Sequence, residues 1–371
     1  MSELVYLSPA RSDGLMQRSH HFVRVYRRLT GRDAIWVEPY GTRLPQARDL
    51  CNRSREAGLT VDRAQKHRAR VPALPLEPLP GLRTLNGWLW RGLRDRLSSR
   101  LGSDGWLVIA RPSRFALDLA SVVASGVRVS LDLMDDVPAF YTGISRRAMD
   151  TTVTALISRA DDLWVTVPEL AERYAAHRKV RLVPNACDPN ALPEPAAEPV
   201  RAGLVYVGTL GDWLDWEWVT HLAEQWPDRS VELIGPVYRR PPRRLPANVS
   251  LVGPLPQADA YRRMQASCVG LIPFRVGPLT DAVDPLKYYE YLACGLSVLS
   301  TPTAPMRRRT GSPGVRIAAI DALAGEAREA LTAPVDPMVA RRVRVEESWC
   351  ARFAPLIGKG GDGVGAPRRF P

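Results

Sequence analysis

Short apolar runs alternate with longer helix-like stretches along most of this chain, and this alternation restricts the folds that it can adopt. Runs rich in valine, leucine and isoleucine are typical of strands buried on both faces of a parallel sheet. Their alternation with helices predicts an α/β fold. The pattern restarts at Gly203. It therefore predicts two α/β units with a cleft between them, where ligands commonly bind.

The expected strands form two series, separated by the Pro- and Ala-rich run Pro189–Pro199, which has the composition of a linker. The first series is Leu4–Pro9, Ala34–Pro39, Gly105–Arg111, Val127–Met134, Asp162–Val167 and Val180–Pro184, and the second is Leu204–Val207, Val231–Gly235, Val249–Val252, Cys268–Pro273, Ser297–Ser300 and Val315–Ala318. We therefore predict a first domain (1–188), a linker (189–200) and a second domain (201–356), which a helix over Pro337–Leu356 closes. The Gly- and Pro-rich tail (357–371) is expected to be disordered, and residues 41–81 match no clear element.

A lysine and a glutamate stand three residues apart at the start of a helix that Gly295 ends. Positions i and i+3 share a helix face, so Lys287 and Glu290 are expected to point the same way. The helix N-terminus and Lys287 together suit a diphosphate, and Glu290 can accept hydrogen bonds from a ribose. Taken alone, the same pair is more commonly a surface salt bridge.

The sequence around this pair, P-L-K-Y-Y-E-Y-L-A-C-G at Pro285–Gly295, resembles the nucleotide-sugar site of GT-B glycosyltransferases. Four further segments agree in family order. Gln17–His21 resembles the first helix of bacterial polysaccharide-type members, and Val183–Asp188 resembles the segment that ends their first domain. Val205–Trp213 resembles the first strand and Gly-rich turn of the donor domain, and Val231–Pro236 with Val249–Pro254 resembles its next two strands.

The resemblance implies two Rossmann-like domains facing across a cleft, a UDP- or GDP-sugar as donor substrate, and no cofactor. It implies that Glu290 holds the donor ribose and that Lys287 meets the diphosphate. Two positions depart from the family pattern. Many retaining members have a second glutamate where this chain has Ala282, and the glycine of the domain-ending segment is Ala186.

Three further residues are candidates for the donor site. Gly208 and Thr209 follow a predicted strand, where backbone N–H groups can approach a phosphate. The alternative for them is an ordinary tight turn. Arg275 follows the strand ending at Pro273 and could grip the diphosphate with two hydrogen bonds. Its alternative is a solvated loop arginine.

Acidic residues end an apolar strand of the first half, in Val129–Val137. A carboxylate beside a cleft can act as general base on a sugar hydroxyl. The segment resembles the place where inverting members carry their base, so we predict Asp135 first and Asp136 second for this role. A helix cap or loop acid is the more common use of such residues. The spacing is not a D-x-D motif, and we predict no required metal.

The start of the first helix supplies four more candidates. His20 and His21 lie there side by side, and one of them is expected to face the cleft, with His21 as the candidate for catalysis. Arg18 and Asp13, just before them, are candidate cleft residues. For each histidine a structural role is the more common alternative.

The composition of the chain indicates the cellular compartment and the kinds of partner to expect. The five cysteines are scattered without C-x-x-C spacing, which favours neither zinc nor disulfides and suggests a reducing cytoplasm. No apolar stretch is long enough to span a membrane, and the N-terminus does not resemble a signal peptide. The net charge is +12, and residues 1–100 hold 19 Lys or Arg against 9 Asp or Glu. This charge suits an anionic acceptor or membrane, while no nucleic-acid module is recognisable.

One stretch of the basic half has the pattern of a membrane-surface helix. Residues 85–101 place leucine at every fourth position, with tryptophans beside the stripe and arginines near it. Such a helix suits a peripheral position on an anionic membrane. An ordinary core-facing helix is the alternative.

These features together predict a metal-independent glycosyltransferase that acts in polysaccharide biosynthesis and leans towards inversion. The acceptor is expected to be a saccharide, a lipid-linked glycan or a natural product. Two alternatives remain: a nucleotide-sugar 2-epimerase of the same fold, or a catalytically silent partner that binds a sugar nucleotide.

Overall fold

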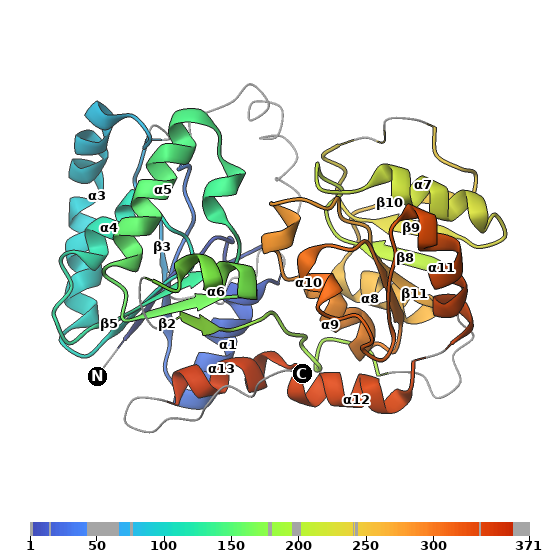
Figure 1. Cartoon of the computed structure of the whole chain (residues 1–371). Coiled ribbons are helices and arrows are strands. Elements are labelled where there is room, and N and C mark those ends of the chain that lie inside the picture. Colours follow the sequence, from blue (N-terminus) through green and yellow to red (C-terminus); the bar gives the residue numbers. More distant parts are fainter. Residues whose placement is uncertain are drawn as a thin grey trace.

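The computed structural model describes residues 3–14, 16–42, 67–74, 77–176, 180–194, 202–239, 241, 244–333 and 335–358, the side chains of 80–83 excepted. Two α/β domains lie side by side (Figure 1). Each contains one sheet in which all the described strand pairs are parallel. The predicted fold class is therefore confirmed.

The first domain is built on a sheet of order β3-β2-β1-β4-β5-β6-β7. Its strands are β1 (Leu4–Leu7), β2 (Ala34–Val37), β3 (Arg68–Ala69), β4 (Trp106–Ile109), β5 (Arg128–Leu133), β6 (Asp162–Val165) and β7 (Val180–Leu182). Its helices are α1 (Arg18–Thr30), α3 (Pro80–Leu101), α4 (Arg114–Ala120), α5 (Gly143–Ile157), α6 (Pro168–Tyr174) and the 3-10 turn η1 (Val137–Phe140). β3 lies within 41–81, where the sequence pattern indicated no element, because two residues are too few to show a pattern.

The second sheet repeats this topology in the order β10-β9-β8-β11-β12-β13. Its strands are β8 (Leu204–Val207), β9 (Val231–Ile234), β10 (Val249–Gly253), β11 (Val269–Ile272), β12 (Ser297–Ser300) and β13 (Val315–Ile317). Its helices are α7 (Trp216–Gln225), α8 (Gln257–Ala266), α9 (Leu286–Ala293), α10 (Ala304–Arg307), α11 (Leu323–Thr332) and α12 (Pro337–Glu346), with the 3-10 turns η2 (Thr280–Ala282) and η3 (Ile320–Ala322).

Both sheets are buried on both faces, as their apolar strands require. Alternate residues of each strand fall into different core clusters: in β4, Leu107 packs on the face covered by α3, α4 and α5, and Val108 on the face covered by α1. In β8, Val205 packs on the side of α8, α9 and α12, and Leu204 on the side of α7 and α11. The carboxyl ends of the parallel strands form one edge of each sheet, and the loops that follow them can carry a site.

The C-terminal helix is two helices, which corrects the prediction of one helix over Pro337–Leu356. The helical conformation is interrupted at Glu347 and Ser348. There the Cys187 N–H donates to the Glu347 carbonyl at 2.9 Å, and the Cys187 carbonyl accepts from the Trp349 N–H at 3.0 Å. Ser348 Oγ then caps α13 (Trp349–Ile357) by accepting from the Ala351 N–H. These bonds between distant segments fix the break.

After this break the chain returns to the first domain. Trp349, Phe353 and Leu356 of α13 join the core cluster of Phe22 in α1, and Figure 1 shows α13 beside α1. By its packing, α13 therefore belongs to the first domain, although the sequence division placed it in the second. Most of the expected linker and tail lies outside the described residues, which include 189–194 and end at Gly358.

Candidate functional site

The carboxyl ends of three adjacent strands in the second sheet are lined by glycine. Gly208 follows β8, Gly235 follows β9 and Gly253 ends β10. Gly235 has φ +144°, and a Cβ there would lie 2.0 Å from the Gly208 carbonyl oxygen. The Gly208 N–H donates to the Ile234 carbonyl at 2.8 Å. Glycine is therefore required for this close approach of the two backbones.

Helix α9 contacts the end of β8, where its Tyr291 hydroxyl accepts from the Val207 N–H at 3.0 Å, and it carries the predicted pair. Lys287 Nζ donates to Glu290 Oε2, as the i, i+3 spacing predicts. Glu290 is 6% exposed, and its other oxygen, Oε1, accepts from the hydroxyl of Tyr261 at 3.1 Å. Gln257 Nε2 in turn donates to that hydroxyl at 2.8 Å. A buried carboxylate with both oxygens occupied is fixed in orientation.

The other predicted donor residues follow strands β8 and β11 of the same sheet. Thr209 is partly buried and its carbonyl accepts from the Tyr206 hydroxyl at 2.9 Å. Arg275 is exposed beyond the carboxyl end of β11, and its N–H donates to the Trp213 carbonyl. The position of the missing second glutamate, Ala282, is 2% exposed and packs against the first domain's core cluster.

On the first domain, Asp135 and Asp136 follow β5 but have different surroundings. Asp136 is buried and forms an ion pair with Arg173 at 2.6 Å. Asp135 is half-buried, and no side chain within the described residues donates to its carboxylate or pairs with it. The structure therefore separates the two candidates, because an acid already neutralised by arginine is a poor base.

The surroundings of Asp135 raise its pKa to about 6. Burial is the main cause, since it disfavours the charged form. Asp284, Asp132 and Asp136 raise the pKa further, while Arg18 opposes them. Asp284 belongs to the second domain, so Asp135 feels the field of both domains at their interface. A base with a pKa near 6 is ionised and able to accept a proton at neutral pH.

Both candidate histidines are buried, and the expectation that one of them faces the cleft stays a prediction. His20 accepts from the Gln17 N–H at 3.1 Å, its Nε2 lies 2.9 Å from the Arg11 carbonyl, and its ring packs on Trp36. Its pKa is lowered by burial.

His21 is 7% exposed and stacks on Trp349 of α13, with ring centroids 5.0 Å apart. Burial lowers its pKa to about 4, and nearby Asp188, 3.6 Å from Nδ1, only partly opposes this effect. The ring is therefore packed between α1 and α13. The sequence did not indicate this, because the covering helix lies far along the chain.

Arg18 is buried among polar partners, and its candidate role at the cleft stays a prediction. It is 3% exposed and grips Asp132 with two bonds of 2.9 and 3.1 Å. A third bond of 3.1 Å goes to the Pro184 carbonyl. Asp13 is half-buried at the carboxyl edge of β1 and pairs with Arg11 and Arg68, and the hydrogen bond from Arg11 contributes most to lowering its pKa to about 2.

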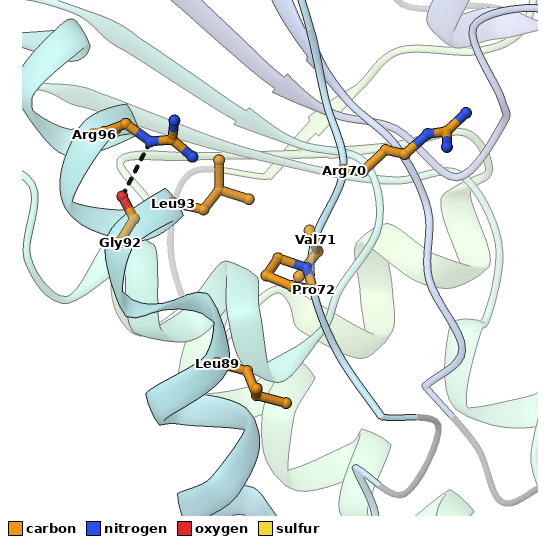
Figure 2. Close-up of a pocket in the computed structure, with 7 residues that line it drawn as sticks. All are labelled: Arg70, Val71, Pro72, Leu89, Gly92, Leu93 and Arg96. Atoms are coloured by element: carbon orange, nitrogen blue, oxygen red, sulfur yellow. Dashed lines mark hydrogen bonds between the residues drawn. The ribbon is translucent and has the colours of Figure 1, made fainter.

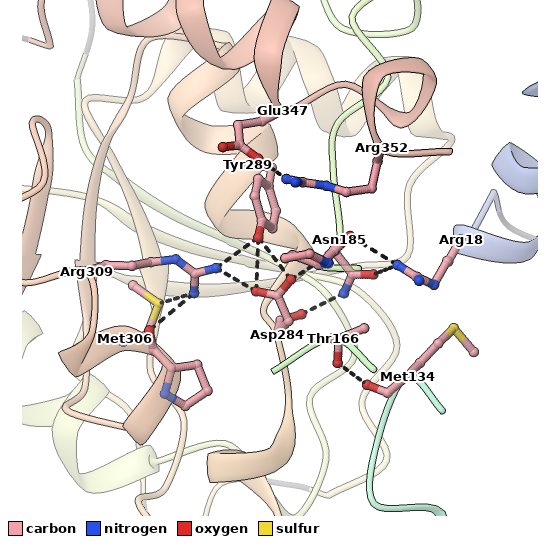
Figure 3. Close-up of polar contacts among 12 residues, drawn as sticks. Arg18, Met134, Thr166, Asn185, Asp284, Tyr289, Met306, Arg309, Glu347 and Arg352 are labelled. Atoms are coloured by element: carbon pink, nitrogen blue, oxygen red, sulfur yellow. Dashed lines mark hydrogen bonds and ion pairs between the residues drawn. The ribbon is translucent and has the colours of Figure 1, made fainter. Parts of the chain in front are cut away.

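A polar network that the sequence did not reveal joins the domains (Figure 3). Its centre is Asp284, which is 3% exposed and directly precedes Pro285 at the start of α9. Asp284 Oδ2 accepts from the Asn185 N–H at 2.6 Å, and Asn185 Nδ2 donates to the Asp284 carbonyl at 2.8 Å. Within its own domain Asp284 pairs with Arg309 at 2.6 Å and accepts from the Tyr289 hydroxyl at 3.0 Å.

Two members of this network stand in segments that carry the family resemblance, Asn185 in Val183–Asp188 and Tyr289 in Pro285–Gly295. Asp284 and Arg309 stand in neither segment. Within the described ranges, no group of three His, Cys, Asp or Glu side chains could hold a metal ion.

The leucine stripe of 85–101 lies on helix α3 and has one buried part and one exposed part. Leu93, Leu97 and Leu101 are buried in the core, which is the ordinary alternative for this helix. Trp88 is 73% exposed and Leu85 is 42% exposed. A shallow groove of about 540 Å³ runs along the helix (Figure 2), lined by Arg70, Val71, Pro72, Leu89, Gly92, Leu93 and Arg96. In the described part of the chain, no helix is both long and apolar enough to cross a bilayer.

Comparison with solved structures gives matches over nearly the whole chain. Sucrose-phosphate synthase from Thermosynechococcus elongatus matches with TM-score 0.62 and 16% identity, covering 96% of this chain and 95% of that one. The lipopolysaccharide outer core galactosyltransferase WaaB matches with TM-score 0.62 and 12% identity, covering 96% and 99%. A trehalose-6-phosphate synthase studied for glycosyl transfer with retention matches with TM-score 0.58 and 13% identity, covering 96% and 98%.

The chain has the GT-B fold. Among curated proteins, it is 27% identical over 175 residues to TuaH of Bacillus subtilis (strain 168), which is named as a teichuronic acid biosynthesis glycosyltransferase. This match covers 42% of the chain and 44% of TuaH, so the chain spans less than half the length of that relative. No protein-family model matches the chain.

Proposed function

We propose that this GT-B protein is a glycosyltransferase that moves a sugar from a nucleoside-diphosphate sugar to an acceptor held by its first domain. The observation that carries the proposal is the geometry of α9. This helix carries Lys287 and the buried Glu290, which are in contact, and its Tyr291 hydroxyl accepts from the N–H of Val207, the residue before Gly208. Asp135 lies close enough to this domain for Asp284 to raise its pKa.

The diphosphate leaving group needs positive charge as the bond to the sugar breaks. In the proposal, Lys287 leaves Glu290 for the diphosphate, and the first N–H groups of α9 and the backbone near Gly208 add their dipoles. Arg275, which is exposed at the same edge, is placed to add a second charge. Glu290, still held by Tyr261, accepts the ribose hydroxyls. No metal is required by this arrangement.

Asp135 takes the proton from the acceptor hydroxyl in this proposal, and the product is inverted at the anomeric carbon. Support comes from the raised pKa of Asp135 and from Ala282, a small apolar residue where many retaining members have a glutamate. The fold itself leaves the stereochemistry open, since a retaining enzyme is among its structural neighbours.

The donor in this proposal is a UDP- or GDP-sugar, and the acceptor is a saccharide, a lipid-linked glycan or a natural product. The similarity to TuaH supports a role in polysaccharide biosynthesis. Four described cysteines, Cys187, Cys268, Cys294 and Cys350, are free thiols, which supports a cytoplasmic site of action.

Contact with an anionic membrane surface is a further part of the proposal. Its support is the outer face of α3, where Trp88 and Leu85 are exposed near Arg91, whose side chain is 72% exposed. A tryptophan between apolar and basic side chains is typical of helices lying on such surfaces.

Thermal-shift screening with a panel of nucleotide sugars, followed by product analysis, tests the function. A donor that binds the folded state raises the melting temperature by mass action. Transfer to an acceptor supports the glycosyltransferase. Turnover of the donor without acceptor would instead indicate an epimerase, and binding without turnover would indicate a silent partner.

A further inference from the structure

Within the described residues, Arg111 is a cation without an ion-pair partner at the carboxyl edge of the first sheet. It lies two residues beyond the end of β4 and is half-buried. Its guanidinium donates to the Tyr40 carbonyl at 2.9 Å and to Thr42 Oγ1 at 3.4 Å. Its Nε is buried, and no described residue accepts a hydrogen bond from it. The acceptors that hold Arg111 are neutral, so they orient the charge without cancelling it.

Arg111 differs in this respect from the other arginines that the structure describes in the first domain. In the part of the first domain that the structure describes, every other arginine with a described side chain either forms an ion pair or is exposed. A charge withdrawn from water without a counter-ion lowers stability. Such a group is better explained by a ligand than by the folding of the domain.

The support of Arg111 is rigid. The Tyr40 hydroxyl donates to Glu77 at 2.6 Å and accepts from the Phe115 N–H at 3.2 Å. This fixes Tyr40 and with it the carbonyl that holds Arg111. A preorganised guanidinium fork loses little freedom when it binds a carboxylate or phosphate.

Arg111 and Asp135 follow neighbouring strands. Ile109 of β4 pairs with Leu131 of β5, and both face the same core cluster. Arg111 lies two residues beyond the end of β4, and Asp135 lies two residues beyond the end of β5, so both belong to loops at the carboxyl edge of the same sheet. The Arg111 partner Thr42 also contacts the Tyr141 hydroxyl at 2.6 Å, just after the turn that follows Asp135.

We propose that Arg111 binds an anionic oxygen group of the acceptor, a phosphate or a carboxylate, while the acceptor hydroxyl reaches Asp135. This inference rests on the proposed function, because it takes the first domain as the acceptor domain. It assigns the acceptor to a class, the acidic or phosphorylated saccharides. The excess of basic residues in the first 100 positions favours the approach of such a molecule.

Titration of the folded protein with inorganic phosphate at constant ionic strength, followed by thermal shift, tests the site. The variants are Arg111→Met, Arg111→Lys and, as a matched loss of charge, Arg159→Met, which removes an exposed arginine after α5. Lys287→Met measures the share of the phosphate effect that comes from the donor site. Half-saturation should need about tenfold more phosphate in Arg111→Met, the scale of a lost charge-assisted hydrogen bond. It should stay unchanged in Arg159→Met, and Arg111→Lys should recover part of the binding.

Glucose 6-phosphate, glucuronate and glucose, compared in the same assay, distinguish the source of the anion. Stabilisation by glucose 6-phosphate alone assigns a phosphate, and stabilisation by both anions assigns a general oxyanion site. The inference is overturned if the wild type shows no phosphate effect, if Arg111→Met keeps it, or if glucose stabilises as much as the anions. Donor binding and its dependence on Glu290 are measured separately, so a failure of the Arg111 inference can be distinguished from a failure of the proposed function.

Discussion

Asp135→Asn should lower the catalytic rate without lowering the stability of the protein. It removes a carboxylate whose charged form is less stable in the folded protein than in the unfolded chain. The carboxyl has a pKa of about 6 in the folded protein against an ordinary value of 3.8. A raised pKa gives a contribution to stability that is complete below pH 3.8 and is lost as the pH rises through 6. The difference corresponds to at most about 3 kcal/mol of unfolding free energy, and about 1–3 kcal/mol after allowing for solvent screening of a half-buried group.

The variant should therefore melt at a higher temperature than the wild type at pH 8 and at a similar temperature at pH 4. Its kcat at pH 8 should fall by about 10²- to 10⁴-fold, the range of a lost general base, with little change in donor affinity. In the wild type, kcat/KM should rise with pH towards a plateau above pH 6 as Asp135 ionises. Thermal melts and initial rates across this pH range measure all three quantities.

Asp136→Asn is the matched control, since it changes the neighbouring carboxylate. It loses the ion pair with Arg173, whose side chain is 46% exposed, so about 1 kcal/mol of stability should be lost with a milder effect on kcat. A fully active Asp135→Asn enzyme, a lower melting temperature at pH 8, or a product with retained anomeric configuration would each refute the base role.

Three further predictions concern the donor site, the domain interface and the outer face of α3. Glu290→Ala should weaken donor binding by about 1–3 kcal/mol. Tyr261→Phe should weaken donor binding less, and it should cause no further loss in the Glu290→Ala background. If calorimetry shows that the losses of the two single variants add up in the double variant, Tyr261 does not act by orienting Glu290. Asp284→Ala should cost about 3–5 kcal/mol of unfolding free energy, because it leaves a buried arginine unpaired; an unchanged urea midpoint would contradict this. The wild type should sediment with anionic vesicles and be released by salt. The double variant Trp88→Ala, Arg91→Glu should not sediment. If the wild type does not sediment at low salt, the outer face of α3 does not bind anionic membranes.

The sequence was most informative where structure depends on neighbours in the chain. Strands β8 and β12 agree with their predicted ranges residue for residue, because short apolar runs between polar stretches have clear ends. The contact between Lys287 and Glu290 follows from helix geometry alone. Asp135 could be selected from its place after an apolar strand, and the structure distinguishes it from Asp136 by the ion pair that Asp136 forms with Arg173.

The sequence was least informative where distant segments meet. His21 is buried by Trp349, and no local pattern shows that a helix from the end of the chain covers α1. The break between α12 and α13 depends on backbone bonds to Cys187 rather than on a helix-breaking residue. Asp284 and Asn185 are 99 positions apart, so their bonds could be found only in the folded chain.

The position of Asp284 links the domain interface to the donor site. On one side it is held by Asn185, whose neighbour Pro184 is bound in turn by Arg18 of the first domain. On the other side it directly precedes α9, whose first turn carries Lys287. A rotation of one domain against the other must therefore either break the bonds between Asn185 and Asp284 or move the start of α9. Because binding and domain orientation then share the same atoms, a ligand that changes one must change the other, and the coupling is reciprocal.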